Sequence, residues 1–421
     1  MKNFKMLILG SDYVTYNVVK EAHKKNMYVI VTDLMQSSPT KDLADESWMI
    51  STTDIDMLEK KCIENNVNCI MFGASDFNIS NARKLCKRLN LPIYCDNDFA
   101  WHIARNKRAF KDLCIKHHVP VSTDYYLDDD LNQEDINKIV YPVVVKPSDK
   151  SGNRGMSFCN NAEELITAYH VAREISDESI VVERKLKGKE YNIHYLLSDS
   201  GSTILYFNST HHEPGEDSNL YSFKCTTSEY LDQYMKEVDL NLRKMFADIG
   251  CNKGIVWVDA MRDDDGHFYL LEMGYRFGGV MTYVPYELVT GFSTINWMID
   301  CACGIDHTAL PNLFEEKQVR CAGSYHLFSK HDDVIYEIDG LEKLNKMDNI
   351  FIDMPKREQC SIREKACFGL IGIYGENVNS FCETLKYVND NLNIKNKNGE
   401  NLFIKYDDYD ELIREYNAGI S

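Results

Sequence analysis

Two acidic residues have a spacing that suits metal binding. They lie in residues 254–273, the run G-I-V-W-V-D-A-M-R-D-D-D-G-H-F-Y-L-L-E-M. The run predicts two β-strands joined at Asp265-Gly266, a favoured two-residue hairpin turn. Counting back from that turn pairs Asp259 with Glu272, and directly opposed residues have Cβ atoms about 5 Å apart on one face of a sheet. The spacing therefore predicts that two carboxylates meet.

The chemistry of this pair follows from its surroundings. Both faces of the predicted hairpin are otherwise apolar, so two like charges destabilise it unless one acid is protonated or a cation lies between them. A hard divalent cation with oxygen ligands, most simply Mg²⁺, resolves the conflict, and Mg²⁺ held by two carboxylates commonly binds substrate phosphates as well. The alternative is a turn longer by one residue, which would point Asp259 and Glu272 to opposite faces.

A candidate phosphate-binding loop lies upstream, in K-P-S-D-K-S-G-N-R-G, residues 146–155. A β-branched strand ends in Lys146, whose ammonium group is a point charge for a phosphate. The loop contains Gly152 and Gly155, and glycines let backbone N–H groups approach oxyanions closely. A solvated hairpin loop without a ligand has the same composition, so the loop alone does not decide between the two interpretations.

A second candidate nucleotide contact is the stretch S-I-V-V-E-R-K-L-K-G-K-E-Y-N-I-H, residues 179–194. A strand ends at Glu183, a glycine-containing connection follows, and a new strand has Glu190 on its polar face with Asn192 and His194. Such a hinge offers backbone edges to a purine and a carboxylate to ribose hydroxyls. A half-exposed hairpin is the plainer interpretation.

The elements that must position these residues follow from the apolar pattern. Short apolar runs at residues 5–9, 27–33 and 69–72 alternate with helix-length segments, which predicts a parallel sheet with helices over about residues 1–95. Residues 231–249 repeat apolar side chains with a helical period and precede a glycine, which predicts an amphipathic helix. The fold class is therefore α/β at the N-terminus and α+β beyond it.

Composition and missing motifs exclude several classes of protein. The net charge of -18 argues against nucleic-acid binding, because phosphate backbones need basic faces. No apolar run approaches the ~20 residues of a membrane span. The first strand leads into G-S-D-Y-V-T rather than G-x-G-x-x-G, and no P-loop motif occurs. The fourteen cysteines form no C-x-x-C pair and are expected as free thiols in a reducing cytoplasm.

In order and spacing, these motifs resemble the ATP-grasp enzymes over nearly the whole chain. K-P-S-D-K-S-G-N-R-G and E-M-G-Y-R-F-G-G are most similar to the carboxylate–amine ligases of the L-amino acid ligase type, with biotin carboxylase and carbamoyl phosphate synthetase as more distant relatives. The resemblance implies a Rossmann-like N-terminal domain, an ATP-grasp fold of two α+β subdomains, and a C-terminal α+β closing domain. The expected bounds of these four parts are residues 1–95, 96–187, 188–305 and 306–421.

The resemblance also implies roles for individual residues. ATP contacts are expected at Lys107, Lys146, Ser151, Gly152, Arg154, Gly155, Glu183, Leu186 and Glu190. The metal ligands are expected to be Asp259 and Glu272. Arg276 and Lys146 are expected to act in catalysis, because a guanidinium fork suits a carboxylate or phosphoryl group and an ammonium neutralises phosphate charge. The family often has Asn two residues after the second acid, where this chain has Gly274, so one ligand for a second metal ion is missing.

The implied activity is that of an ATP- and Mg²⁺-dependent ligase, with one or two metal ions and Mn²⁺ as a substitute. It activates a carboxylate as an acyl phosphate and joins it to an amine such as an amino acid, releasing ADP and phosphate. Bicarbonate activation on the same fold and a catalytically lapsed nucleotide-binding regulator are alternatives. Substrate contacts are expected at Gly10, Ser11, His211, His212, Lys224, Gly278 and Gly279. The expected partners are small molecules, not nucleic acid or a membrane, and homodimers are common among such ligases.

Overall fold

The computed structural model describes residues 4–150, 152–212, 221–226, 229–279, 283–307, 309–311, 321–354 and 358–418. Its N-terminal part contains a four-stranded parallel sheet in the order β3-β2-β1-β4. The elements here are β1 (Lys5–Leu9), α1 (Tyr13–Lys24), β2 (Tyr28–Thr32), α2 (Pro39–Leu43), β3 (Glu46–Trp48), α3 (Ile55–Asn65), β4 (Cys69–Phe72) and α4 (Asp76–Leu89). The predicted alternation of parallel strands and helices is confirmed.

A three-stranded antiparallel sheet, in the order β6-β5-β7, follows along the chain. Its strand β5 contains the lysine of the predicted phosphate loop as its last residue but one, and α8 packs on one face around a small apolar core. The elements of this part are α5 (Asp98–Ile103), α6 (Lys107–Lys116), α7 (Gln133–Ile136), β5 (Val143–Pro147), β6 (Ser157–Cys159), α8 (Ala162–Glu174) and β7 (Ile180–Arg184).

The largest sheet has eight strands in the order β12-β11-β8-β9-β10-β13-β18-β16. Its strands are β8 (Gly188–Ser198), β9 (Gly201–His212), β10 (Tyr221–Thr226), β11 (Gly254–Asp263), β12 (Phe268–Gly274), β13 (Cys321–Phe328), β16 (Ile350–Asp353) and β18 (Cys367–Gly375). The strands on either side of the expected domain boundary at residue 305 belong to this one sheet. The C-terminal part therefore extends the sheet that carries the two acids.

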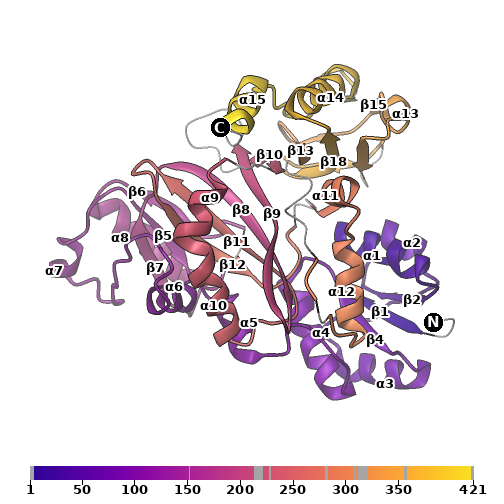
Figure 1. Cartoon of the computed structure of the whole chain (residues 1–421), viewed down its shortest axis with the longest axis horizontal. Helices are drawn as coiled ribbons and strands as arrows, with labels where there is room; N and C mark the ends of the chain where they lie inside the picture. The colour runs from indigo at the N-terminus through magenta and orange to yellow at the C-terminus, as the bar shows by residue number, and fades with distance from the viewer. Residues whose placement is uncertain are drawn as a thin grey trace.

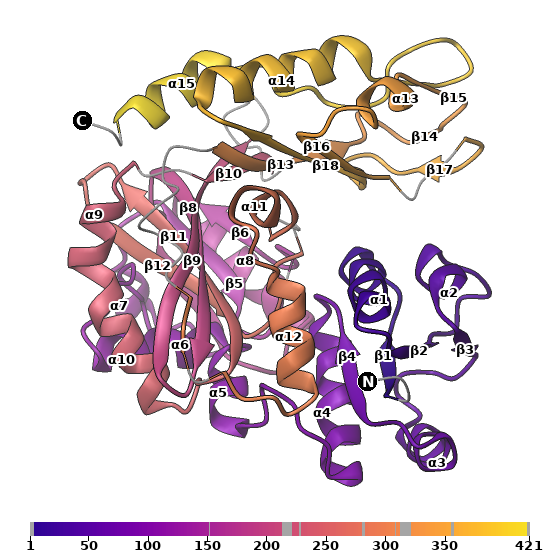
Figure 2. The same ribbon diagram turned by 45° about the vertical axis from the view of Figure 1, so that its right-hand side comes forward.

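Helices pack against the faces of the large sheet, as Figure 1 and Figure 2 show. The predicted helix at 231–249 is present as α9 (Leu231–Tyr234), a π-helical turn η1 (Met235–Asp239) and α10 (Leu240–Asp248). Two further helices are α11 (Tyr283–Thr290) and α12 (Thr294–Ala302), and α12 packs between β11 and the N-terminal elements α1 and β4. The C-terminal part adds α13 (Leu341–Leu344), α14 (Val378–Asn391), α15 (Tyr409–Ala418), β14 (Asp333–Val334), β15 (Glu337–Asp339), β17 (Ser361–Ile362) and β19 (Asn393–Lys395).

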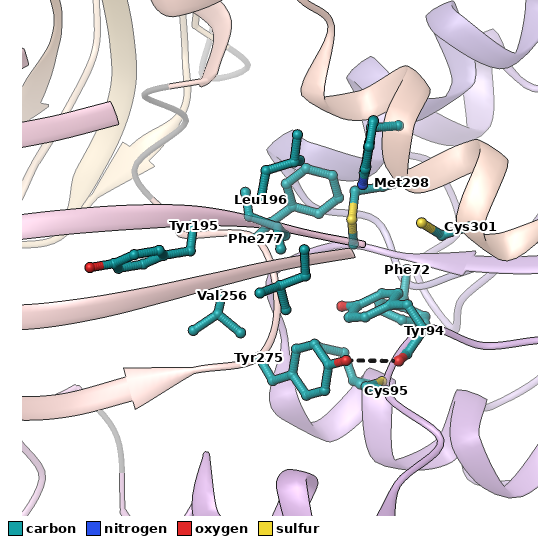
Figure 3. Packing of buried hydrophobic residues seen from close by; sticks show 14 of the residues in the cluster. Phe72, Tyr94, Cys95, Tyr195, Leu196, Val256, Tyr275, Phe277, Met298 and Cys301 are labelled. Carbon is teal, nitrogen blue, oxygen red and sulfur yellow. Dashed lines mark hydrogen bonds between the residues drawn. The ribbon is translucent and has the colours of Figure 1, made fainter. Parts of the chain in front are cut away.

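A buried aromatic cluster joins the N-terminal part to the acid-bearing hairpin (Figure 3). Tyr275 follows β12 directly, and its hydroxyl donates to the carbonyl oxygens of Tyr94 over 3.0 Å and of Lys253 over 2.9 Å. The ring of Tyr94 packs against Tyr275 on one side and Phe72 of β4 on the other. Because Tyr275 is fully buried, these contacts hold the end of β12 against the N-terminal part.

Two general features follow from the described residues. No helix among them is both long and apolar enough to cross a bilayer. All fourteen cysteines carry free thiols, and burial raises the pKa of several of them, for example that of Cys62 to about 12. A buried thiol of this kind is a small apolar core residue and not a nucleophile.

Candidate active site

The hairpin that carries the two acids has a turn one residue longer than predicted. The Asp263 N–H donates to the His267 carbonyl over 2.9 Å, and the Gly266 N–H donates to the Asp263 carbonyl over 2.8 Å. Gly266 has φ +85°, a left-handed conformation that glycine adopts without steric cost. By itself, this longer turn would shift the register by one residue and send the two carboxylates to opposite faces.

A β-bulge restores the meeting of the two acids. On the turn side of the bulge Ala260 pairs with Leu270, whereas the next pair joins Asp259 to Glu272, so that Leu271 is an extra residue on β12. The extra residue reverses the shift that the longer turn introduces. The predicted pairing of Asp259 with Glu272 is therefore confirmed, although the predicted two-residue turn is wrong.

Negative charge is concentrated around Asp259. Burial, with the nearby charges of Glu190 and Glu272, raises the pKa of Asp259 to about 7 despite the ammonium group of Lys224. The Asn192 amide donates to Asp259 Oδ1 over 2.6 Å and fixes the carboxylate. Mg²⁺ prefers hard oxygen ligands such as carboxylates. A divalent cation between crowded carboxylates also relieves their mutual repulsion. The residues present therefore fit the divalent cation that the sequence predicts.

Lys107 approaches the same carboxylates from the first turn of α6. Its Nζ lies 3.1 Å from Glu272 Oε2 and donates to the carbonyl oxygen of Lys150 over 2.6 Å. The carbonyl belongs to the predicted phosphate loop, so one side chain connects that loop to the acid pair. The Asn106 side chain caps α6 by accepting from the Ala109 N–H over 3.0 Å, which sets where the helix begins and where Lys107 points.

Lys146 is held by Glu183 in a buried ion-pair network. The Glu183 carboxylate contacts the ammonium groups of Lys146 and Lys111, and it accepts from the Ser122 hydroxyl over 2.7 Å. Burial alone would raise the pKa of Glu183, but the two ammonium groups lower it to about 2. The structure thus shows Glu183 orienting Lys146, whereas its predicted contact with ATP stays a prediction.

A cavity of about 660 Å³ joins these groups. Its volume is in the range of small-molecule sites, about 300–1,000 Å³. Strands of the three-stranded sheet and of the large sheet line it together. The predicted residues in its wall are Lys107, Lys146, Gly152, Glu183, Leu186, Glu190, His212, Lys224, Asp259, Glu272, Arg276, Gly278 and Gly279. The structure therefore brings together nucleotide, metal and catalytic candidates that lie far apart in the sequence.

The two adjacent histidines point to opposite faces of β9, as strand alternation requires. His212 lines the cavity, with Nε2 3.2 Å from Glu190 Oε2. Burial would raise the pKa of Glu190, but the hydrogen bond from His212 lowers it. His211 is buried behind the cavity, where its Nδ1 lies 3.1 Å from Glu411 Oε2 on α15. The structure does not bring His211 to the predicted substrate contact.

Several other predicted residues lie outside this cavity. Gly10 packs against Asn78, and Ser11 accepts from the Ser38 hydroxyl over 3.0 Å in the N-terminal part, so neither reaches the cavity wall. Gly155 has φ +72° and no room for a Cβ atom beside Ile175 Cδ1, which explains the glycine without a ligand. Arg154 lines an adjoining cavity instead. Ser151 lies outside the described residues.

Arg276 stands where the hairpin meets the N-terminal part. Its Nε donates to Asp76 Oδ1 over 2.6 Å, and its Nη1 donates to the carbonyl oxygen of Phe277 over 2.8 Å. The guanidinium carbon lies 5.1 Å from the centre of the Trp257 ring. These contacts orient a planar cation toward the cavity, and that orientation suits a carboxylate or phosphoryl group.

Sequence reasoning missed most of the apolar wall of the cavity. Trp257, Asp259 and Met261 alternate along β11 and therefore share one face, a signal that the period of a strand could have revealed. Asn192 faces Asp259 in the register of β8 with β11, and it was already expected on the polar face of its strand. The apolar wall residues that carry no polar signal include Val144, Met156, Phe158 and Leu271. The other unpredicted wall residues are Ala74, Asn153, Arg184, Lys185 and Gly188.

Comparisons with known proteins agree with this geometry. Residues 139–284 match the family model described as an ATP-grasp domain. The formate-dependent phosphoribosylglycinamide formyltransferase of Prochlorococcus marinus is 28% identical over 181 residues, which is 42% of this chain and 45% of that protein. A D-alanine–D-alanine ligase of Saccharophagus degradans is 33% identical over 135 residues, which is 31% of this chain and 41% of that protein. The chain thus spans about half the length, or less, of these curated relatives.

A solved structure resembles almost the whole chain. The L-amino acid ligase from Bacillus licheniformis superposes with a TM-score of 0.76 over 94% of this chain and 100% of that protein, at 18% sequence identity. At that identity the likeness is one of fold. It extends beyond the matched domain to the N-terminal and C-terminal parts.

Proposed function

Because residues 139–284 are an ATP-grasp domain, we propose that this protein is an ATP- and Mg²⁺-dependent ligase that joins a carboxylate to an amine. The substrate carboxylate attacks the γ-phosphorus of ATP, so that a new O–P bond forms and ADP leaves. The amine then attacks the acyl carbon of the acyl phosphate, and inorganic phosphate leaves as the C–N bond forms. Amino acids are the first candidates for both substrates.

The residues of the chain act mainly by position and charge. Lys107 and Lys146 neutralise phosphate oxygens, and the buried pair with Glu183 keeps Lys146 charged by raising its pKa against the effect of burial. The apolar wall of the cavity stacks on the nucleobase. Arg276 orients the attacking carboxylate. Asp259 and Glu272 would hold Mg²⁺, which when bound neutralises charge on the phosphates.

One observation carries the proposal: the facing carboxylates Asp259 and Glu272 share a cavity wall with Lys107 and Lys146. Paired acids alone would suit many metal sites, and paired lysines alone would suit many anion sites. Together, in a cavity of about 660 Å³, they suit a magnesium–triphosphate substrate.

The test is release of ADP by the full chain with ATP, Mg²⁺ and pairs of amino acids. We expect substrate-dependent ADP and phosphate, with a condensed product detected by mass. Asp259→Asn should abolish release, whereas Asp264→Asn, an exposed position in the turn of the same hairpin, should not. Formation of AMP and pyrophosphate would contradict the proposal. ADP release that needs bicarbonate but no amine would favour a carboxylase-type reaction instead.

A further inference from the structure

A second cavity of about 610 Å³ adjoins the first. The two cavities share wall residues at the reaction centre, namely Ala74, Lys107, Trp257, Glu272 and Arg276. One face of α4 lines the second cavity, with its residues at helical spacing: Asp76, Phe77, Ser80, Asn81 and Lys84. A molecule in the second cavity would therefore reach from the reaction centre along α4.

The acidic groups of the second cavity are already neutralised. Asp76 accepts from Arg276 over 2.6 Å, and Glu272 lies 3.1 Å from Lys107 Nζ. Asp149 accepts from the neighbouring Lys150 ammonium over 2.6 Å. Each carboxylate in the wall thus has a cation beside it. Apart from Glu272, which the proposed function assigns to Mg²⁺, none of them is left to attract a positively charged ligand.

Two cationic side chains at the end of the cavity away from the reaction centre have no acidic partner among the described residues. Lys84 on α4 and Arg105 after α5 both line it with exposed side chains, and neither forms an ion pair among the described residues. Arg105 donates only weakly, to the Ser80 hydroxyl over 3.5 Å, and its guanidinium lies 5.6 Å from the Trp101 ring. In a chain with a net charge of -18, two cations without acids beside one cavity are a local departure from the overall charge.

Two buried donors in the same wall also lack acceptors. Asn81 is 5% exposed and Trp257 is 8% exposed. Neither Asn81 Nδ2 nor Trp257 Nε1 has a hydrogen-bond partner among the described residues. A buried donor without an acceptor is costly, and a ligand or a water molecule that supplies an acceptor oxygen removes that cost. Cations and N–H donors both call for a ligand rich in acceptor oxygens and negative charge.

We propose that the second cavity binds a carboxylate substrate that carries a second anionic group, either a phosphate or another carboxylate. The reactive carboxylate lies at the shared wall beside Arg276. The second anionic group lies at the far end, held by Lys84, Arg105 and the amide of Asn81. This proposal rests on the proposed function for the reaction, and it adds the class of substrate and the residues that select it.

A binding experiment tests the site without knowledge of the substrate. The full chain is first saturated with Mg²⁺ and a non-hydrolysable ATP analogue, which occupies the phosphate positions of the first cavity, and is then titrated with inorganic phosphate while thermal unfolding is followed. We expect a saturable rise in Tm. The variant Lys84→Gln/Arg105→Gln should bind phosphate about tenfold or more weakly, since each charged hydrogen bond contributes about that factor.

Matched controls separate this site from general charge effects. Lys87 on α4 and Lys116 on α6 are exposed and line neither cavity. The variant Lys87→Gln/Lys116→Gln should therefore respond to phosphate as the unchanged protein does. Absence of a phosphate response in the unchanged protein, or the same response in both double variants, would overturn the proposal. The same experiment measures the rise in Tm that the nucleotide analogue causes before phosphate is added. Absence of that rise would refute the proposed function, and it is distinguished in this way from absence of a phosphate response.

Matched substrates distinguish the two kinds of anion. In the ADP-release assay, L-glutamate and O-phospho-L-serine are compared with L-glutamine and L-serine, whose side chains are neutral. We expect at least about tenfold higher kcat/KM for a doubly anionic acid, and a rise in its KM in Lys84→Gln with little change in kcat. Preference for O-phospho-L-serine assigns a phosphate and preference for L-glutamate assigns a carboxylate. Equal or better use of the amino acids with neutral side chains would refute the substrate class.

Discussion

The indole of Trp257 occupies the space beside Gly274 on the facing strand. A Cβ atom at position 274 would lie 2.3 Å from two carbons of that ring and 2.5 Å from Nε1, closer than any side chain tolerates. The two residues are paired across β11 and β12, one step from the pair that joins Met273 to Val258. The glycine at the position where the family often has Asn therefore has a steric reason in this chain.

Replacing Gly274 by alanine should destabilise the fold, because the indole must move out of a packed wall. We expect a loss of about 1–3 kcal/mol in the free energy of unfolding, measured with a chemical denaturant. The double variant Trp257→Ala/Gly274→Ala should tolerate the new methyl group, so the cost of the second substitution should nearly vanish there. An equal cost in both backgrounds would contradict the contact.

Glu183→Gln should be among the most destabilising conservative substitutions in the chain. It leaves the ammonium groups of Lys146 and Lys111 close together and buried without their shared carboxylate. Removing one partner of a buried ion pair costs about 3–5 kcal/mol. Adding Lys111→Met to the variant should recover part of that loss, as denaturant unfolding of the single and double variants can measure.

The same carboxylate makes acid stability depend on pH in a defined window. The folded-state pKa of Glu183 is about 2, below its ordinary value of 4.5, so its contribution is fully present above pH 4.5 and is lost as the pH falls toward 2. The difference in unfolding free energy between the unchanged protein and Glu183→Gln should shrink across that window. A difference that stays constant from pH 5 to pH 2.5 would show that this acid is not held ionised.

Glu272→Gln should remove activity while leaving the fold intact, because it removes one of the crowded negative charges. We expect kcat/KM for ADP release to fall by about two orders of magnitude or more, and higher Mg²⁺ should restore only part of it. Thermal unfolding should show an unchanged or slightly higher Tm. Full activity at low Mg²⁺ would refute the assignment of this residue as a metal ligand.

Arg276→Lys should lower kcat more than it weakens ATP binding. Lysine keeps the charge but cannot give Asp76 and the Phe277 carbonyl separate, fixed N–H donors as the guanidinium does. We expect a fall of about tenfold or more in kcat, with a nucleotide affinity, measured by calorimetry, close to that of the unchanged protein. A large change in ATP affinity with unchanged kcat would show that Arg276 contacts the nucleotide.

The sequence predicts the fold well because the elements of the fold follow local periodicity. The parallel strands near the N-terminus are short, buried and apolar, and the helix at 231–249 has a clear period. The pairing of Asp259 with Glu272 was reached through an expected turn that is too short, because a bulge at Leu271 compensates for the longer turn. No local signal in the sequence marks that bulge.

What could not be predicted depends on contacts between distant segments. Glu183 appears as the end of a strand, but its partner Lys111 comes from a helix 72 residues earlier. His211 and His212 look alike in the sequence, and only the packing of α15 against β9 decides which of them is covered. The second cavity forms where α4 meets the hairpin, so no sequence motif predicts that Lys84 and Arg105 line a cavity.

The continuous eight-stranded sheet has a consequence for how this chain can be divided. Lys224, in the wall of the first cavity, lies on β10, and β10 is hydrogen-bonded to β13 with Lys224 opposite Ser324. Cutting the chain before β13 would leave β10 with a row of unsatisfied backbone groups, a surface prone to aggregate. The residues from β13 onward therefore complete the sheet that lines the first cavity, and a protein cut before β13 should be prone to aggregate.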